Sequence, residues 1–207
     1  MPARVKVCGI TSPEDALLAA EAGASAIGLV FWPNSPRFVD RATARRIVDV
    51  LPSFVLRVGV FVDQSLDMMT RTSEDVGLDI IQLHGSERPE MVACLPRRAL
   101  KAIRVGEESV LEQVEQYEGT AILLDTRDGQ QPGGTGRSFD WRLAQQVRAK
   151  VRFLVLAGGL QADNVAQAIR TVGPDAVDVS SGVESRPGKK DPGKLKAFME
   201  AVRSSSR

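Results

Sequence analysis

The alternation of short apolar runs with longer amphipathic segments is the feature that most constrains the fold of this chain. Each apolar run is rich in Val, Ile and Leu, which is typical of strands that pair in parallel and are buried on both faces. Eight runs fit this description, and they span residues 4–10, 24–31, 55–62, 78–83, 100–105, 121–125, 151–156 and 176–180.

The segments between these runs have the apolar periodicity of helices. The clearest are residues 13–22, 42–51, 109–117, 163–172 and 194–202, whereas the segments after the third and fourth strands are shorter. Eight strand–helix units of roughly 26 residues predict an α/β fold, a single (β/α)8 or TIM barrel. An open doubly wound sheet is the alternative, but no glycine-rich dinucleotide fingerprint opens the first helix.

The composition of the chain limits the classes of partner and metal site that it can have. The 207 residues fit one domain, residues 1–207, and the net charge of +1 argues against a nucleic-acid partner. One histidine, His84, and two cysteines, Cys8 and Cys94, are too few for a structural zinc site, and we expect no metal. The sequence shows no secretory signal and no apolar run of membrane-spanning length. We therefore expect free thiols, a cytoplasmic location and no membrane partner.

The active site of such a barrel lies at the C-terminal ends of its strands. Gly158 and Gly159 follow the seventh strand, and Ser180, Ser181 and Gly182 follow the eighth. Loops at these two places commonly hold a phosphate, because their backbone N–H groups face the anion and glycine permits close approach. The sequence therefore predicts a small phosphorylated ligand. Taken singly, each glycine motif can also be a simple turn.

Cys8 ends the first strand, and alternation places it on the same face as Lys6. A neighbouring ammonium is expected to lower the pKa of the thiol and favour the thiolate, the form that can act as a base. A buried structural thiol is the commoner fate of a lone cysteine. Cys94 lacks such a setting, and we interpret it as a core residue.

Asp125 ends the sixth strand, where partial desolvation is expected to raise the pKa of its carboxyl and equip it to donate a proton. The alternative is a helix-capping aspartate. Asp178 lies within the eighth strand and needs a partner, for which Lys6 on the neighbouring first strand is the candidate. A structural ion pair is therefore favoured for Asp178 over a substrate contact. His84 either contacts substrate or orders the rim of the barrel.

Taken together, the motifs resemble those of the phosphoribosylanthranilate isomerase family, which acts in tryptophan biosynthesis. They follow in order along essentially the whole chain, and the one small departure is Asp63, where asparagine is familiar. The matching segments are residues 6–11, 31–37, 58–62, 82–85, 124–125, 133–136 with 139–141, 158–160 and 177–184.

This resemblance implies an Amadori rearrangement of N-(5-phosphoribosyl)anthranilate, with Asp125 as general acid and Cys8 as general base. Arg37 would meet the anthranilate carboxylate, and the loops at Gly159 and Ser180 would meet the phosphate. Proton transfers alone complete such an isomerisation, so no cofactor is expected. One alternative is the related isomerase of histidine synthesis, which carries aspartates at both catalytic positions. Another is a non-catalytic barrel that binds a sugar phosphate. The chain is expected to be a monomer or a homodimer.

Overall fold

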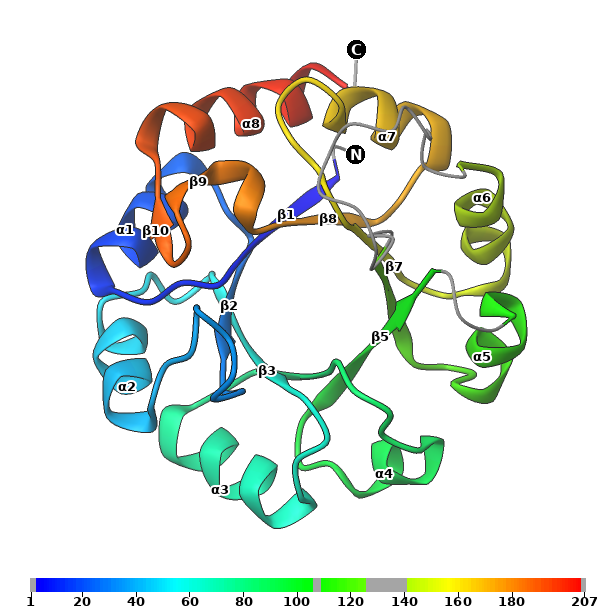
Figure 1. Cartoon of the computed structure of the whole chain (residues 1–207), viewed down its shortest axis with the longest axis horizontal. Helices are drawn as coiled ribbons and strands as arrows, with labels where there is room; N and C mark the ends of the chain where they lie inside the picture. The colour runs from blue at the N-terminus through cyan, green and yellow to red at the C-terminus, as the bar shows by residue number, and fades with distance from the viewer. Residues whose placement is uncertain (1–2, 106–108, 126–140, 206–207) are drawn as a thin grey trace.

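The computed structural model describes residues 3–105, 109–125 and 141–205. Eight parallel strands hydrogen-bond in chain order, and the eighth pairs with the first to close a barrel (Figure 1). The predicted barrel is confirmed, and the open sheet is excluded. The strands are β1 (Arg4–Cys8), β2 (Ala26–Val30), β3 (Leu56–Phe61), β4 (Ile80–Leu83), β5 (Arg98–Arg104), β6 (Ala121–Asp125), β7 (Leu154–Ala157) and β8 (Ala176–Val179).

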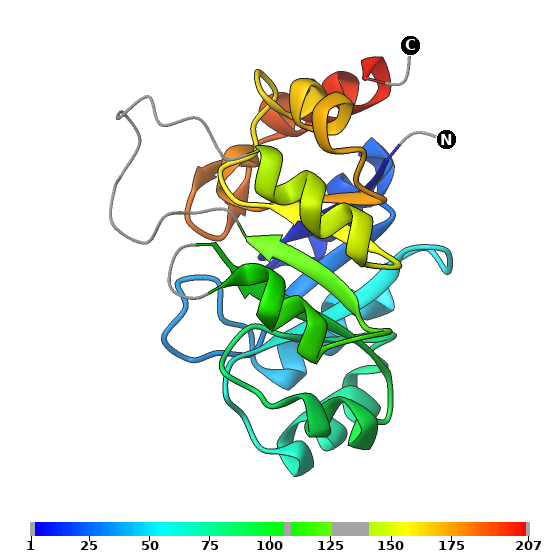
Figure 2. The ribbon, with the colours of Figure 1, turned by 90° about the vertical axis from the view of Figure 1, so that its right-hand side faces the viewer.

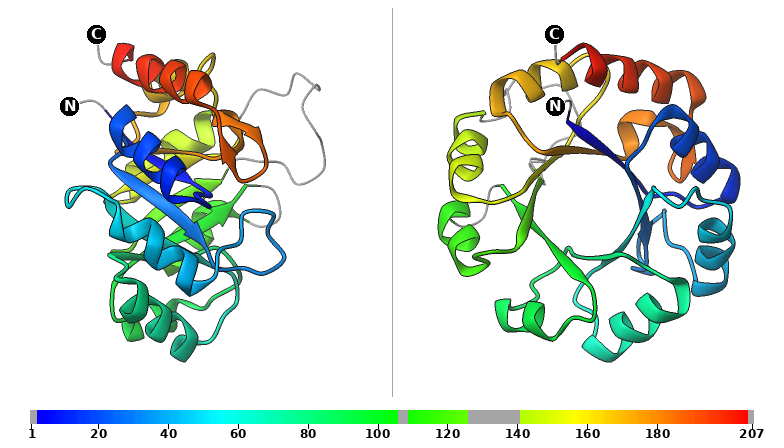
Figure 3. Two further views of the ribbon diagram at one scale, coloured as in Figure 1. Left: turned by 90° about the vertical axis from the view of Figure 1, so that its left-hand side faces the viewer. Right: turned by 180° about the vertical axis from the view of Figure 1, so that it is seen from behind.

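A ring of helices surrounds the barrel, as Figure 1 shows from one end and Figure 3 from behind. Five of these helices begin at a Ser or Asp whose side chain accepts a hydrogen bond from a first-turn backbone N–H. The helices are α1 (Pro13–Ala22), α2 (Arg41–Asp49), α3 (Leu66–Val76), α4 (Pro89–Cys94), α5 (Val110–Gln116), α6 (Trp141–Lys150), α7 (Val165–Val172) and α8 (Pro192–Ser204).

Element boundaries differ from the predicted ones by a few residues. β7 begins three residues later than expected, because Val151 still bonds back to Val147 at the end of α6. The sequence pattern did not predict the segment after β8. There a 3₁₀ turn, η1 (Ser181–Val183), leads into a short antiparallel pair, β9 (Glu184–Arg186) and β10 (Lys189–Lys190).

Apolar side chains form two packed regions. The larger lies between the barrel and the helices and includes Ile27, Phe61 and Phe198, all fully buried. The smaller lines the barrel interior and includes Leu100 and Leu123. Alternate residues of each strand point inward, which is how a barrel of eight strands fills its interior with side chains.

One buried ion pair crosses the barrel interior between the first and last strands. Lys6 and Asp178 are register partners, and the Lys6 ammonium lies 2.9 Å from the Asp178 carboxylate. Only 5% and 10% of these two side chains are exposed, so each supplies the charge that the other needs once it is removed from water. The predicted ion pair is therefore confirmed.

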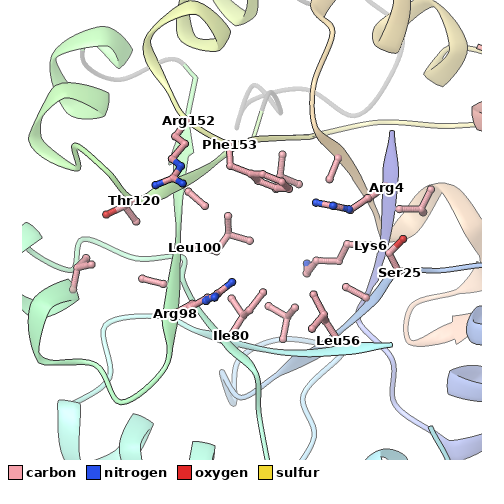
Figure 4. Close-up of a pocket in the computed structure, with 18 of the residues that line it drawn as sticks. Arg4, Lys6, Ser25, Leu56, Ile80, Arg98, Leu100, Thr120, Arg152 and Phe153 are labelled. Carbon is pink, nitrogen blue, oxygen red and sulfur yellow. The ribbon is translucent and has the colours of Figure 1, made fainter. Parts of the chain in front are cut away.

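The two ends of the barrel carry different cavities. At the N-terminal ends of the strands, a cavity of about 660 Å³ has largely apolar walls. Figure 4 shows the charged ends of Arg4, Arg98 and Arg152 pointing into it. The cavity that concerns function lies at the opposite end. In the part of the chain that the structure describes, no helix is long and apolar enough to cross a membrane.

Candidate active site

A cavity of about 950 Å³ opens at the C-terminal ends of the strands. Its walls come from the ends of β1, β2 and β3, from β4 to β8, and from the loops that follow β2, β7 and β8. Every predicted site residue lines it, namely Cys8, Arg37, His84, Asp125, Gly158, Gly159, Asp178, Ser180, Ser181 and Gly182. The structure thus brings together side chains that are spread over most of the sequence.

Cys8 is partly buried at the end of β1, on the same inward face as Lys6. Burial raises the pKa of the Cys8 thiol, and the nearby Lys6 ammonium only partly opposes this. The negative charge of Asp178 adds to the upward shift. The prediction that Lys6 lowers the thiol pKa below its ordinary value is therefore wrong. The shared face of Lys6 and Cys8 is as predicted.

Cys94, the second thiol, is also not where it was predicted to be. It ends the short helix α4 and is exposed rather than part of the core. Its sulfur lies 3.6 Å from the backbone oxygen of Glu90, one turn earlier in the same helix. Cys94 therefore offers a second free thiol, remote from the cavity, against which Cys8 can be compared.

Asp125 ends β6, and His84 follows β4 on the same side of the barrel. The His84 Nε2 atom lies 3.6 Å from an Asp125 carboxyl oxygen, and each side chain is about one-fifth exposed. The other ring nitrogen of His84 lies 2.8 Å from the side-chain nitrogen of Gln82. β5 lies between the strands of His84 and Asp125, while β7 and β8 separate Asp125 from the strand of Cys8.

Arg37 reaches the cavity from the loop after β2 and is held there by a carboxylate. Its Nε and Nη2 atoms donate to the two oxygens of Glu184, at 2.9 and 2.6 Å. These hydrogen bonds raise the pKa of Arg37, although burial opposes the shift. The fork is a bidentate pair of the geometry that arginine makes and lysine does not.

Lys190 makes the remaining contacts of the Arg37–Glu184 pair with the ends of β1 and β8. Its side chain is fully buried, and its ammonium donates to Glu184 at 2.9 Å and to the backbone oxygen of Cys8 at 2.6 Å. A third contact, at 3.3 Å, reaches the backbone oxygen of Ser180. One lysine on β10 therefore ties together the end of β1, the end of β8 and the carboxylate that holds Arg37.

The loops after β7 and β8 pack directly against each other. A β-carbon on Gly182 would overlap the backbone oxygen of Leu160, so only glycine permits this approach. Gly159 has a φ of +63° and open space where a side chain would point. Asn164 fixes its loop, because its amide nitrogen donates to the Gly159 oxygen at 3.1 Å. Two glycine-containing segments thus form one wall of the cavity.

Three residues of this site were not predicted from the sequence. Glu184 and Gln82 both lay within segments that match the family, 177–184 and 82–85, but neither was given a role, and Gln82 is buried in an otherwise apolar strand. Lys190 could not be recognised in the sequence, because two adjacent lysines, Lys189 and Lys190, are typical of an exposed charged segment. The predicted glycine run at 133–136 and the motif at 139–140 lie outside the described residues.

The closed parallel barrel and its cavity place the chain in the class of (β/α)8-barrel proteins with a site at the C-terminal strand ends. Comparison with known proteins narrows this class. The family model for N-(5'phosphoribosyl)anthranilate (PRA) isomerase matches residues 5–201. An N-(5'-phosphoribosyl)anthranilate isomerase of Pelobacter propionicus is 50% identical over 200 residues, which is 97% of this chain and 95% of the relative.

Solved structures agree. A phosphoribosyl anthranilate isomerase in complex with reduced 1-(o-carboxyphenylamino)-1-deoxyribulose 5-phosphate has a TM-score of 0.89 and 43% identity, covering 98% of this chain and 99% of that one. Monomers generated from the dimeric phosphoribosylanthranilate isomerase of Thermotoga maritima have a TM-score of 0.87 and 42% identity, covering 97% of this chain and 98% of that one. The chain belongs to the phosphoribosylanthranilate isomerase family and is an isomerase of tryptophan biosynthesis.

Proposed function

We propose that residues 1–207 form one catalytic barrel in which Asp125 is the general acid and Cys8 the general base. The reaction is the Amadori rearrangement of N-(5-phospho-β-D-ribosyl)anthranilate to 1-(2-carboxyphenylamino)-1-deoxy-D-ribulose 5-phosphate. The observation that supports these roles most strongly is the placement of both groups in one cavity with Arg37 and the two glycine-containing loops.

The first step opens the sugar ring. Asp125 gives its proton to the furanose ring oxygen while the C1′–oxygen bond breaks. The lone pair of the anthranilate nitrogen moves into a new C1′–N double bond, which gives a cationic Schiff base. The carboxylate left on Asp125 faces the Nε2 atom of His84, which can stabilise the negative charge.

The second step moves a proton from carbon to the base. Cys8, acting as thiolate, takes the proton from C2′, and the electrons of the C–H bond neutralise the Schiff base to give an enolamine. Tautomerisation of the enolamine then yields the ketone product, so no atom is gained or lost. A thiolate whose conjugate acid has a raised pKa is a stronger proton acceptor, which suits removal of a carbon-bound proton.

Substrate binding uses the two anionic ends of the molecule. Arg37 is proposed to contact the anthranilate carboxylate with the edge of its guanidinium that Glu184 does not occupy. Gly158, Gly159 and the segment Ser180, Ser181 and Gly182 are proposed to hold the phosphate through backbone N–H groups. His84 and Asp178 line the same cavity and are proposed to complete the contacts to the ribose-derived part.

The test is turnover of freshly made substrate, followed by the fall in its anthranilate fluorescence. Asp125→Asn and Cys8→Ser are each expected to reduce kcat by roughly 10²–10⁴-fold, the range for a lost general acid or base. Near-normal kcat in either variant would refute that role. Turnover of the ribosylamine of histidine synthesis, which carries no anthranilate and is followed by chromatography of the product, distinguishes the alternative reaction. No turnover of either compound would favour a non-catalytic barrel.

We also propose that the chain is a homodimer with a second copy seated on its N-terminal end. The segment between α2 and β3 projects from that end in Figures 2 and 3, and it carries Phe54, whose side chain is 99% exposed. The largely apolar cavity of Figure 4 lies at the same end. A two-fold axis there would place each Phe54 in the cavity of the other copy, among its apolar walls and the guanidinium groups of Arg4, Arg98 and Arg152, and would remove the phenyl ring from water.

Light scattering after gel filtration tests the dimer. The wild type is expected at about twice 22.4 kDa, and Phe54→Ser at the monomer mass. Phe38→Ser, at a residue 42% exposed after β2 and at the opposite end, is the matched control and should remain dimeric. A monomeric wild type would refute the dimer.

We place the enzyme in the cytoplasm, in keeping with its two free thiols, Cys8 and Cys94.

A further inference from the structure

Gln82 has a buried side chain that contacts His84, and His84 in turn faces Asp125, the proposed general acid. It lies on β4 with 1% of its surface exposed. Its amide nitrogen is 2.8 Å from Nδ1 of His84, and Nε2 of the same ring is 3.6 Å from Asp125 Oδ2. The Gln82 carbonyl oxygen is buried and has no hydrogen-bond partner among the described residues. The amide is thus committed to one contact, the histidine.

This contact determines where the imidazole carries its hydrogen. A neutral imidazole has one donor and one acceptor nitrogen, and an amide nitrogen can only donate. If the Gln82 amide nitrogen faces Nδ1, then Nδ1 accepts and the hydrogen must lie on Nε2, the atom that faces Asp125. The reversed amide would leave the Nε2 lone pair facing the carboxylate that Asp125 becomes after it gives up its proton, which is electrostatically unfavourable.

We propose that Gln82 is a positioning residue that holds His84 in the Nε2–H tautomer and so directs a hydrogen-bond donor at Oδ2 of Asp125. The inference rests on the proposed role of Asp125 as general acid. A donor at Oδ2 confines the transferable proton to the other carboxyl oxygen, Oδ1. It also stabilises the carboxylate that remains after proton transfer, because a hydrogen bond to a charged oxygen is stronger than one to a neutral oxygen.

The 3.6 Å separation between His84 Nε2 and Asp125 Oδ2 is longer than a hydrogen bond. Catalytic contacts of this kind shorten when the substrate complex forms and water is displaced. Gln82 itself needs no movement, since its bond to His84 is already at 2.8 Å. The tautomer is therefore set before substrate arrives, and only the last contact forms on binding.

Nitrogen-15 NMR tests the tautomer directly, because His84 is the single histidine of the chain and its ring signals need no assignment. The wild type is expected to show the Nε2–H form. Gln82→Glu presents only an acceptor to Nδ1 and should move the hydrogen to that nitrogen. Gln64→Met, at a glutamine that donates to the Phe31 backbone instead, is the matched control and should leave the tautomer unchanged. A wild-type Nδ1–H form, or an unchanged spectrum in Gln82→Glu, would overturn the proposal.

Kinetics test whether the tautomer matters for the acid. Gln82→Met has similar size without a donor, and it provides a second variant if a buried glutamate prevents folding. Its kcat is expected to fall about 10- to 100-fold with little change in KM, the scale of one hydrogen bond to a charged group. In an Asp125→Asn background the same change should cause no further loss. Full multiplicative loss in that background would show that Gln82 does not act through Asp125.

The two failures are distinguishable. Normal turnover in Asp125→Asn alone would refute the proposed acid, and with it any catalytic effect of the tautomer. Failure of the NMR prediction, with Asp125→Asn inactive, would refute Gln82 as the positioning residue and leave the proposed function standing.

Discussion

Replacing Arg37 by alanine separates two roles of one guanidinium. Nε and Nη2 already serve Glu184, so the remaining edge is proposed to contact the anthranilate carboxylate. Loss of one hydrogen bond to a charged group costs about 1.5–3 kcal/mol of substrate binding. At 1.36 kcal/mol per factor of ten, this corresponds to a fall in kcat/KM of about 10- to 150-fold. Arg37→Lys should recover only part of the loss, because an ammonium cannot reproduce the fork.

The same substitution should also destabilise the protein. Removing one partner from a buried ion pair costs about 3–5 kcal/mol. The Arg37 side chain is 19% exposed, and Glu184 retains Lys190, so we expect about 2–3 kcal/mol. For a chain of this size, that corresponds to a fall in Tm of about 4–12 °C. Thermal unfolding followed by circular dichroism measures it.

The decisive assay compares two substrates. Wild type should turn over the aniline analogue poorly, because it lacks the carboxylate, and Arg37→Ala should add little further loss with it. Arg57→Ala is the matched control, since Arg57 makes the same Nε and Nη2 fork to Asp79 away from the cavity. It should lower Tm without changing KM. If Arg37→Ala weakens both substrates equally, Arg37 orders its loop and does not bind the carboxylate.

Three further predictions test other parts of the site. Cys8→Ser should reduce kcat by at least about 100-fold, whereas Cys94→Ser should leave it unchanged; equal effects in the fluorescence assay would contradict the choice of thiol. Gly159→Ala, with its side chain directed into open space at the proposed phosphate wall, should raise KM. Gly173→Ala has a nearly identical φ and equally open space at the end of α7, so it should cost similar stability with KM unchanged; a similar KM rise in both would argue against the phosphate contact. Burial disfavours the charged form of Glu184, but its two cationic partners outweigh this and lower its pKa. This stability is present above the unfolded-state pKa of about 4.3 and is lost as pH falls toward the folded-state value. Urea unfolding between about pH 5 and 3 should therefore depend less on pH in Glu184→Gln, and an unchanged slope would refute the coupling.

Much of the barrel could be predicted because its pattern is local. Each strand can be recognised in the sequence by a continuous apolar run, and the order of strands in a (β/α)8 barrel follows the order of the chain. Once that order is assumed, β1 and β8 are neighbours, and the partnership of Lys6 with Asp178 follows from the need to pair two buried charges. The residues that line the cavity follow from the same reasoning, since each strand end contributes to one mouth.

The network around Arg37 could not be predicted in this way. Glu184 and Arg37 are 147 positions apart, and their contact depends on the path of a short loop rather than on a periodic pattern. Lys190 is harder still, because its burial depends on the β9–β10 pair folding back over the end of β1. The partners of charged side chains such as Glu184 and Lys190 can be assigned only when the conformation of the loop that carries them is known.

The error over Cys8 shows which physical effect was left out. Alternation correctly placed an ammonium beside the thiol, but Asp178, which lies against the same lysine, opposes part of the effect of Lys6 on the thiol pKa. Burial then dominates, because removing a thiolate from water disfavours the charged form. In the resting enzyme the proton therefore stays on sulfur more than in a free cysteine. Only the deprotonated fraction of Cys8 can accept the C2′ proton, and a thiolate whose conjugate acid has a raised pKa is the stronger acceptor for a proton bound to carbon.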